Sequence, residues 1–302
     1  MRRHASWCVA AAAVCLLVAG CVRLPDLGSA LLPDPALERA VREAIGKPSG
    51  RLAPSDLVGL TTLDASGLGI TDIEGLQYGV DLTTLLLGSN IESGARNRIA
   101  ELAPLRTLTN LETLSIDGND VADIAPLAGM TKLRQLLASG NDIERIDALA
   151  GLTELELLTL GRNRIADLHP LAGLHALAIL QLRDNRVVDL APLAGLVRLE
   201  YLSLFGNEIV EIAPLAGLLN LGILYLEDNR ITDISALAGL RALRHQGLSG
   251  NEIHDITPLV RNTGLADGAK IDLRWNRLDT RPGSPDAALL QHLIQRGAVV
   301  QW

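Results

Sequence analysis

Residues able to do chemistry are few in this sequence, and most lack a partner at a useful spacing. The three cysteines, Cys8, Cys15 and Cys21, all lie in the first 21 residues. The histidines at 169, 175, 245, 254 and 292 show no spacing typical of a metal site, and no glycine-rich phosphate loop follows a strand-like segment. We therefore expect no enzymatic activity, no cofactor and no metal ion.

One column of carboxylates is a candidate metal site. These acidic residues each stand four residues after a repeated asparagine, with Arg145 interrupting them: Asp123, Asp167, Asp189, Glu211, Asp233 and Asp255. Stacked at about 5 Å, they could offer oxygen ligands to Ca²⁺, which takes about six to eight of them. Because each repeat brings only one carboxylate, we expect instead that each caps backbone amides of the following turn.

These residues belong to a unit of 22 residues that recurs from Leu111 to Leu259. Leucines alternate with other residues before each repeated asparagine, which predicts a short strand with one buried face, and a proline after it disfavours a second strand. One unit cannot bury its apolar face alone, so the units must stack with their strands in one parallel sheet. The asparagines, expected to hydrogen-bond backbone groups of the turns, are Asn119, Asn141, Asn163, Asn185, Asn207, Asn229 and Asn251.

The pattern L-x-x-L-x-L-x-x-N, as in residues 199–207, resembles the leucine-rich repeat. The 22-residue length is similar to that of internalin-like bacterial proteins and of a eukaryotic phosphatase-regulator family. The resemblance implies a leucine-rich repeat solenoid. This would be a curved right-handed superhelix with a concave parallel β-sheet, an irregular or 3₁₀ convex side, and helical N- and C-terminal caps.

The repeats account for most of the chain, and caps are expected at both ends. We expect an N-terminal helical cap at 34–59 and repeats at 60–281, about nine full and one partial, followed by a helix–strand cap at 282–302. Asp34 with Pro35, and Ser284 with Pro285, predict the two helix starts. Leu87 and Asn90 are expected in register, with extra residues near 90–96 that form a ligand-contacting loop or a tolerated insertion. Gln246 places an amide where a buried leucine is expected.

The first 21 residues predict export. Arg2 and Arg3 precede about 16 mostly apolar residues, which suits a signal peptide at 1–20 better than a membrane span. The run 17–21 resembles a bacterial lipobox, which implies cleavage before Cys21, lipid attachment there and a tether at 21–33. Val22 then implies sorting to the outer membrane, again by resemblance to lipoproteins. An ordinary signal peptide is the alternative.

The charge of the chain argues against two classes of partner. Its formal net charge is −8, and loss of the signal peptide removes Arg2 and Arg3 but no acidic residue. Nucleic acid and anionic lipid surfaces are therefore disfavoured as main partners. A lipid anchor, rather than charge, would hold the chain to a membrane.

Function is expected on the concave face, where side chains between the strand leucines point out of the sheet. Aromatic residues make up only 2% of the chain, yet Tyr201, Phe205 and Tyr225 fall on adjacent strands. Clustered aromatics rimmed by charge are typical of a protein-binding hot spot, although scattered apolar groups are normal on any surface. The candidate partner-binding residues are Leu157, Ile179, Arg183, Tyr201, Ser203, Phe205, Ile223, Tyr225, Glu227 and His245.

The sequence thus predicts a non-enzymatic, monomeric, membrane-tethered module of the bacterial cell envelope, at the outer membrane or cell surface. Its partner would be a protein or glycan ligand on the concave face. Two alternatives stay open: a regulatory subunit of a phosphatase-like enzyme, and a structural envelope protein without a specific ligand.

Overall fold

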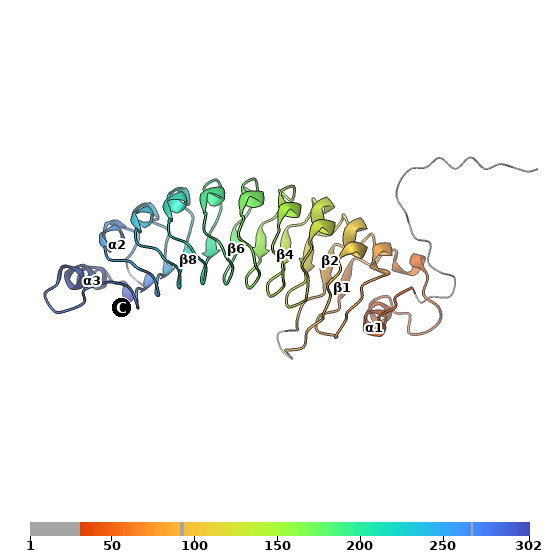
Figure 1. Ribbon diagram of the computed structural model, residues 1–302. Coiled ribbons are helices and arrows are strands. Elements are labelled where there is room, and N and C mark those ends of the chain that lie inside the picture. Colours follow the sequence, from red (N-terminus) through yellow and green to blue (C-terminus); the bar gives the residue numbers. More distant parts are fainter. Residues whose placement is uncertain (1–30, 91–93, 267) are drawn as a thin grey trace, which may run out of the picture.

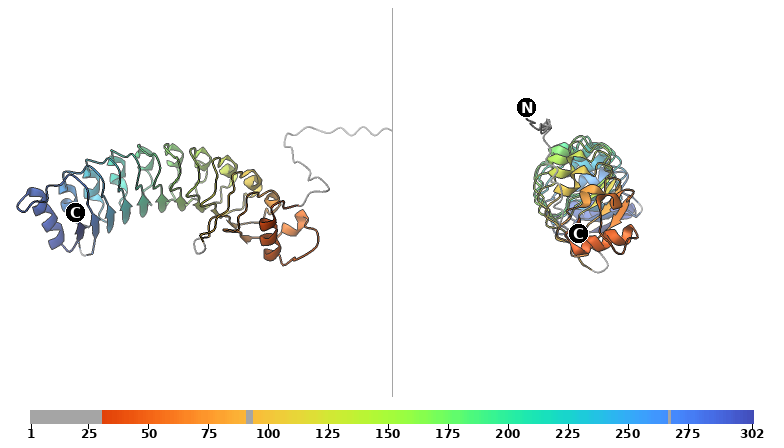
Figure 2. Two further views of the ribbon diagram at one scale, coloured as in Figure 1. Left: turned by 60° about the horizontal axis from the view of Figure 1, so that its bottom comes forward. Right: turned by 90° about the vertical axis from the view of Figure 1, so that its right-hand side faces the viewer.

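The computed structural model describes residues 31–90, 94–266 and 268–302, which form one arched solenoid (Figure 1). Strands line the inner side of the arch and short helical turns its outer side, as the tilted view shows (Figure 2). The expected signal peptide, the lipidation site Cys21 and most of the tether lie outside the described residues. Within the described ranges, no helix is long and apolar enough to cross a membrane.

The concave side is a single parallel sheet of eleven strands, each paired with the next in chain order. The pairing never slips, so Leu180 lies opposite both Leu158 and Leu202. The strands are β1 Thr62–Asp64, β2 Thr84–Leu86, β3 Thr113–Ser115, β4 Gln135–Leu137, β5 Leu157–Thr159, β6 Ile179–Gln181, β7 Tyr201–Ser203, β8 Ile223–Tyr225, β9 His245–Gly247, β10 Lys270–Asp272 and β11 Val299–Gln301.

The convex side consists of 3₁₀ turns and one short helix, α2 (Thr257–Arg261). Most of these segments carry proline in their first two positions, where its fixed φ suits the turn and its missing N–H is not needed. The 3₁₀ segments are Pro54–Leu57, Leu76–Tyr78, Ala103–Thr107, Ala125–Gly129, Asp147–Leu149, His169–Leu171, Ala191–Leu193, Ala213–Gly217 and Ser235–Gly239.

The core is a set of leucine columns that run the length of the arch. The middle residue of each strand points inward, and Leu158, Leu202 and Leu224 are 0% exposed. Full burial of such a side chain stabilises the fold by about 1.5–3 kcal/mol. Gln246 interrupts this column in β9. It is 2% exposed, and neither its amide oxygen nor its amide nitrogen has a hydrogen-bond partner.

Both ends of the leucine columns are capped. Helix α1 (Pro35–Ala44) starts at Asp34, whose carboxylate accepts hydrogen bonds from two backbone amides of the first turn. Helix α3 (Pro285–Gln295) starts at Ser284, and the chain then forms β11, which pairs with β10. These helix starts are those that the sequence predicts.

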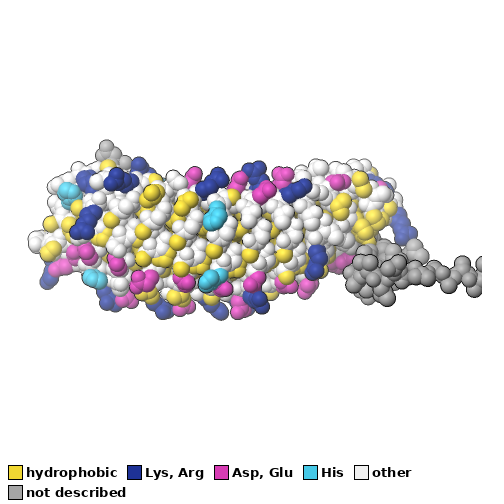
Figure 3. Space-filling model, turned by 90° about the horizontal axis from the view of Figure 1, so that it is seen from above, with side chains coloured by type: hydrophobic (Ala, Val, Ile, Leu, Met, Phe, Trp, Pro, Cys, Tyr) yellow, Lys and Arg dark blue, Asp and Glu magenta, His cyan; other side chains and the backbone are white. Residues whose placement is uncertain are grey.

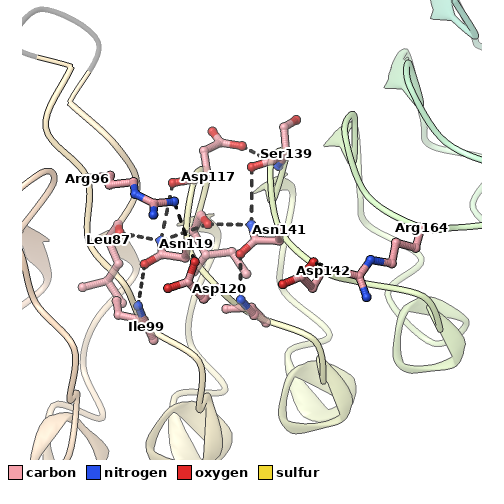
Figure 4. A network of polar contacts seen from close by, with 12 residues as sticks. Leu87, Arg96, Ile99, Asp117, Asn119, Asp120, Ser139, Asn141, Asp142 and Arg164 are labelled. Carbon is pink, nitrogen blue, oxygen red and sulfur yellow. Dashed lines mark hydrogen bonds and ion pairs between the residues drawn. The ribbon is translucent and has the colours of Figure 1, made fainter. Parts of the chain in front are cut away.

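The repeated asparagines form a ladder between strands and turns (Figure 4). Asn119 Oδ1 accepts from the Ile99 N–H at 2.9 Å, while its Nδ2 donates to the carbonyls of Leu87 and Ile116, both at 3.0 Å. One side chain therefore joins two repeats. The same three bonds recur at Asn141 and in the later repeats, which confirms the expected structural role.

The ladder agrees with the expected position of the insertion at 90–96, since Asn97, 22 residues before Asn119, is the ladder asparagine of its repeat. Asn97, not Asn90, donates to the Leu87 carbonyl at 2.9 Å and accepts from the Ile70 N–H. Asn90 instead takes part in a local turn, in which its N–H donates to the Ala95 carbonyl. The extra residues thus precede the ladder asparagine of their repeat, because only Asn97 lies deep enough to bridge two repeats.

Candidate binding face

The strands present their first and third residues on the concave face, and the sheet holds these positions in straight columns. Strands β5 to β9 place Leu157, Ile179, Tyr201, Ile223 and His245 in the first column, and all five are half-buried. Because neighbouring strands in a sheet lie about 4.8 Å apart, this column forms one continuous surface. The structure therefore brings these five candidates together.

Two tyrosines form the centre of this surface. The rings of Tyr201 and Tyr225 lie edge to face, with centroids 5.9 Å apart and planes at 66°. Burial raises the pKa of Tyr201, with smaller contributions from Tyr225 and Glu227. An edge-to-face pair is a favoured aromatic geometry and holds both rings in place. The pair thus offers a pre-formed apolar contact.

Polar and aromatic side chains follow the strands and rim the tyrosine pair. Arg183, Phe205 and Glu227 hold equivalent positions in three successive repeats, just beyond β6, β7 and β8. Arg183 is exposed, and the other two are half-buried. Ser203 differs from the expectation. It is 5% exposed, because a short side chain between larger neighbours is covered, so it cannot serve as a main contact.

Two carboxylates, Asp184 and Asp228, lie at the turn beyond the strands. Asp184 and Asp228 adopt positive φ (55° and 52°) at a position that Gly206 and Gly250 occupy in the next repeats. A Cβ on Gly206 would lie 2.7 Å from Asp184 Oδ1, and one on Gly250 would lie 2.1 Å from Asp228 Oδ1. Each aspartate therefore leans over the neighbouring glycine.

The acidic column caps turns, as the sequence predicts. Asp123 Oδ1 accepts from the Ala125 N–H at 2.8 Å, and the other aspartates bond in the same way two residues ahead. Glu211 shows no such bond within the described chain. The described residues contain no group of three or more His, Cys, Asp or Glu side chains that could hold a metal ion.

A row of exposed ion pairs follows the ladder asparagines by one position. Asp142 pairs with Arg164, Glu208 with Arg230 at 3.5 Å, and Glu252 with Arg277 at 2.7 Å. Exposed pairs of this kind each contribute about 1 kcal/mol or less. Charged side chains gather along the two long margins of the convex face, with apolar and small side chains between them (Figure 3). The ion pairs therefore contribute little to stability.

Known proteins share both the repeat and the arch. Residues 197–239 match the family described as leucine-rich repeats (2 copies). Over 68 residues, 22% of this chain, the sequence is 43% identical to internalin H of Listeria monocytogenes, of which that stretch covers only 12%.

Two solved structures from Listeria monocytogenes resemble most of the arch. The structure of an internalin (inlF) is similar with a TM-score of 0.71 and 26% identity, over 90% of this chain and 89% of that one. The structure of internalin C2 is similar with a TM-score of 0.56 and 34% identity, over 82% of this chain and 95% of that one.

Proposed function

Because the chain belongs to the leucine-rich-repeat family and has internalin-like homologues, we propose that it is a non-enzymatic protein-binding module of the bacterial cell envelope. The partner is a protein that docks on the concave face, centred on Tyr201 and Tyr225. Cleavage before Cys21 and lipid attachment there tether the chain to a membrane, with the outer membrane as its site.

The edge-to-face tyrosine pair carries this proposal. Aromatic side chains bury much area at little entropic cost and dominate many protein interfaces. Here the two rings sit on a sheet whose register is held by the asparagine ladder, so little ordering is needed on binding. Leu157, Ile179 and Ile223 extend the apolar contact across neighbouring strands.

Site-specific crosslinking in living cells tests the docking face. A photoreactive phenylalanine derivative, which keeps an aromatic ring, replaces Tyr225, and a matched variant carries it at Leu219, which is 61% exposed and lies just beyond the convex 3₁₀ segment Ala213–Gly217. We expect one defined protein adduct from position 225 that position 219 does not give. Equal adducts from both positions, or none from 225, would refute docking on this face.

The tether has a separate test. Mass spectrometry of the membrane fraction should show a mature N-terminus at Cys21 with lipid mass attached. A chain that keeps residues 1–20, or one cleaved elsewhere without lipid, would contradict the proposed anchor. A glycan partner would appear as loss of the crosslink after glycosidase treatment.

A further inference from the structure

A cavity of about 440 Å³ opens on the concave face next to the tyrosine pair, above strands β8 to β11. Its volume falls within the range of about 300–1,000 Å³ that is typical of ligand sites. The residues that line it are Tyr225, Glu227, His245, Gln246, Gly247, Lys270, Ile271, Asp272, Val299 and Gln301. Four of its polar residues, Gln246, Lys270, Asp272 and Gln301, have no role in the tyrosine-centred contact.

Gly247 creates the space. Of the eleven strands, only β9 ends in glycine, and this residue lies opposite Tyr225 on one side and Asp272 on the other. Its φ is not positive, so the backbone there does not require glycine. A Cβ at this position would lie 1.8 Å from Glu227 Oε1. The missing side chain therefore admits the carboxylate of Glu227.

Glu227 is incompletely satisfied in this position. Its Oε2 atom is buried and has no hydrogen-bond partner. Burial raises the pKa of the Glu227 carboxyl, a hydrogen bond from its own backbone N–H partly offsets this, and the nearby carboxylates of Asp272 and Asp228 raise the pKa further. Asp272 itself is paired, since Arg274 lies 2.6 Å from its Oδ2. Of the two carboxylates that line the cavity, Glu227 is thus the one without an ion-pair partner among the described residues.

The other ionisable groups of the cavity do not neutralise Glu227. Lys270 and His245 line the same space, yet within the described part of the chain neither forms an ion pair or side-chain hydrogen bond. A half-buried carboxylate with one unsatisfied oxygen is costly, whereas a cationic donor would both pair the charge and satisfy that oxygen. The cavity therefore suits a cation.

We propose that the cavity over Gly247 receives an arginine side chain of the protein partner, whose guanidinium pairs with Glu227 and lies against the ring of Tyr225. This assignment rests on the proposed docking function and names one contact within it. Arginine is favoured over lysine because its guanidinium is planar, is more weakly hydrated and stacks on aromatic rings. The half-covered site penalises the more strongly hydrated ammonium.

A defined peptide tests the assignment. The full chain, labelled with ¹⁵N, is titrated with acetyl-Gly-Arg-Gly-amide, with its lysine analogue, and with the neutral citrulline analogue, which keeps the shape of arginine but not its charge. We expect saturable shifts of the Gly247 amide with the arginine peptide, and at least tenfold weaker binding of the citrulline peptide. Equal binding of the two peptides, no saturable shift at Gly247, or tighter binding of the lysine analogue would overturn the proposal.

Variants separate the cavity from the rest of the face. Glu227→Gln, which is isosteric, and Gly247→Ala, whose Cβ displaces the carboxylate, should each weaken the arginine peptide at least fivefold. Asp184→Asn is the matched control: it alters a concave carboxylate two repeats away, at a positive φ that asparagine tolerates, and should leave binding unchanged.

Unchanged binding in Glu227→Gln would overturn the arginine site. If that variant keeps the crosslink from position 225, only this site fails. If the wild-type crosslink is also absent, the docking function fails with it.

Discussion

The carboxylate of Asp34 bonds the backbone N–H of Thr71 at 2.9 Å, across 37 residues of chain. Its other oxygen accepts from the amides of Ala36 and Leu37 at the start of α1. One side chain thus begins the capping helix and fastens it to the first repeat. Burial raises the pKa of Asp34, but the backbone hydrogen bonds from Thr71, Leu37, Ala36 and Asp72 outweigh it and lower the pKa below its ordinary value.

Asp34→Asn should therefore destabilise the N-terminal cap at neutral pH by about 2 kcal/mol, because the amide presents a donor where the fold presents N–H groups. A carboxyl with a lowered pKa stabilises the fold above its unfolded value and loses that effect as pH falls through the folded value. We expect the difference from wild type in urea titrations to persist above about pH 5 and to fade below about pH 3.

Asp123→Asn is the control for this titration. Asp123 makes one local hydrogen bond, to the Ala125 N–H, and that bond survives in an amide. We expect a change within about 0.5 kcal/mol at every pH. A difference for Asp34→Asn that grows in acid would contradict the cap account.

Asn207→Ala tests the ladder. The change leaves the Val187 N–H and the carbonyls of Leu182 and Leu204 without the side chain that they share. We expect a loss of about 3 kcal/mol in the free energy of unfolding, together with faster hydrogen exchange at Val187. Asn220→Ala, which removes one exposed bond to the Val197 carbonyl, should cost about 1 kcal/mol or less. Equal losses in the free energy of unfolding for the two variants would show that the ladder asparagine stabilises the fold no more than an exposed one.

Gln246→Leu should stabilise the protein. Both polar atoms of this buried amide are unpaired, and the neighbouring strands place Leu224 and Ile271 at the same depth. Replacing an unsatisfied amide by an apolar side chain of similar length should gain about 1–3 kcal/mol. A higher urea midpoint with an unchanged slope would confirm the gain. A lower midpoint would show that the amide of Gln246 stabilises the folded protein and would contradict this prediction.

Tyr201→Ala should weaken binding of the crosslinked partner by about 2 kcal/mol or more, and Tyr225→Ala should do the same. The two rings support each other, so the double variant should lose less than the sum of the single losses. Affinity by calorimetry and the urea midpoint should be measured together. Leu219→Ala, on the opposite side of the arch, should leave affinity unchanged.

Much of the fold could be predicted from periodicity. The 22-residue interval determines which residues share a column, and alternation in each strand determines which face they occupy. Strand pairing, the structural role of Asn119 and its equivalents, and the helix starts at Pro35 and Pro285 follow from these rules. The repeat interval also identifies Asn97, which lies 22 residues before Asn119, as the ladder asparagine of its repeat, although Asn90 follows Leu87 at the usual spacing of three residues.

The details of the site needed coordinates. The column pattern places Ser203 on the concave face, yet its burial depends on the size of its neighbours. The carboxylate of Glu227 lies over Gly247 of the next repeat because of the rotamer that the Glu227 side chain adopts. The alternation of residues along a strand does not determine that rotamer. The signal in the sequence is Gly247, a glycine at a strand position whose backbone conformation does not require one.

Each inner asparagine of the ladder accepts from the residue 20 positions earlier and donates to the carbonyl 25 positions earlier, whichever repeat it occupies. A block of 22 residues can therefore be duplicated or removed between two such asparagines, and every asparagine still finds its hydrogen-bond partners at the same spacings. Slippage in the gene would lengthen or shorten the sheet by whole strands, about 5 Å at a time. The length of the molecule can thus change by whole repeats, and the tyrosine pair and its neighbouring cavity are preserved when the added or lost block lies before β7.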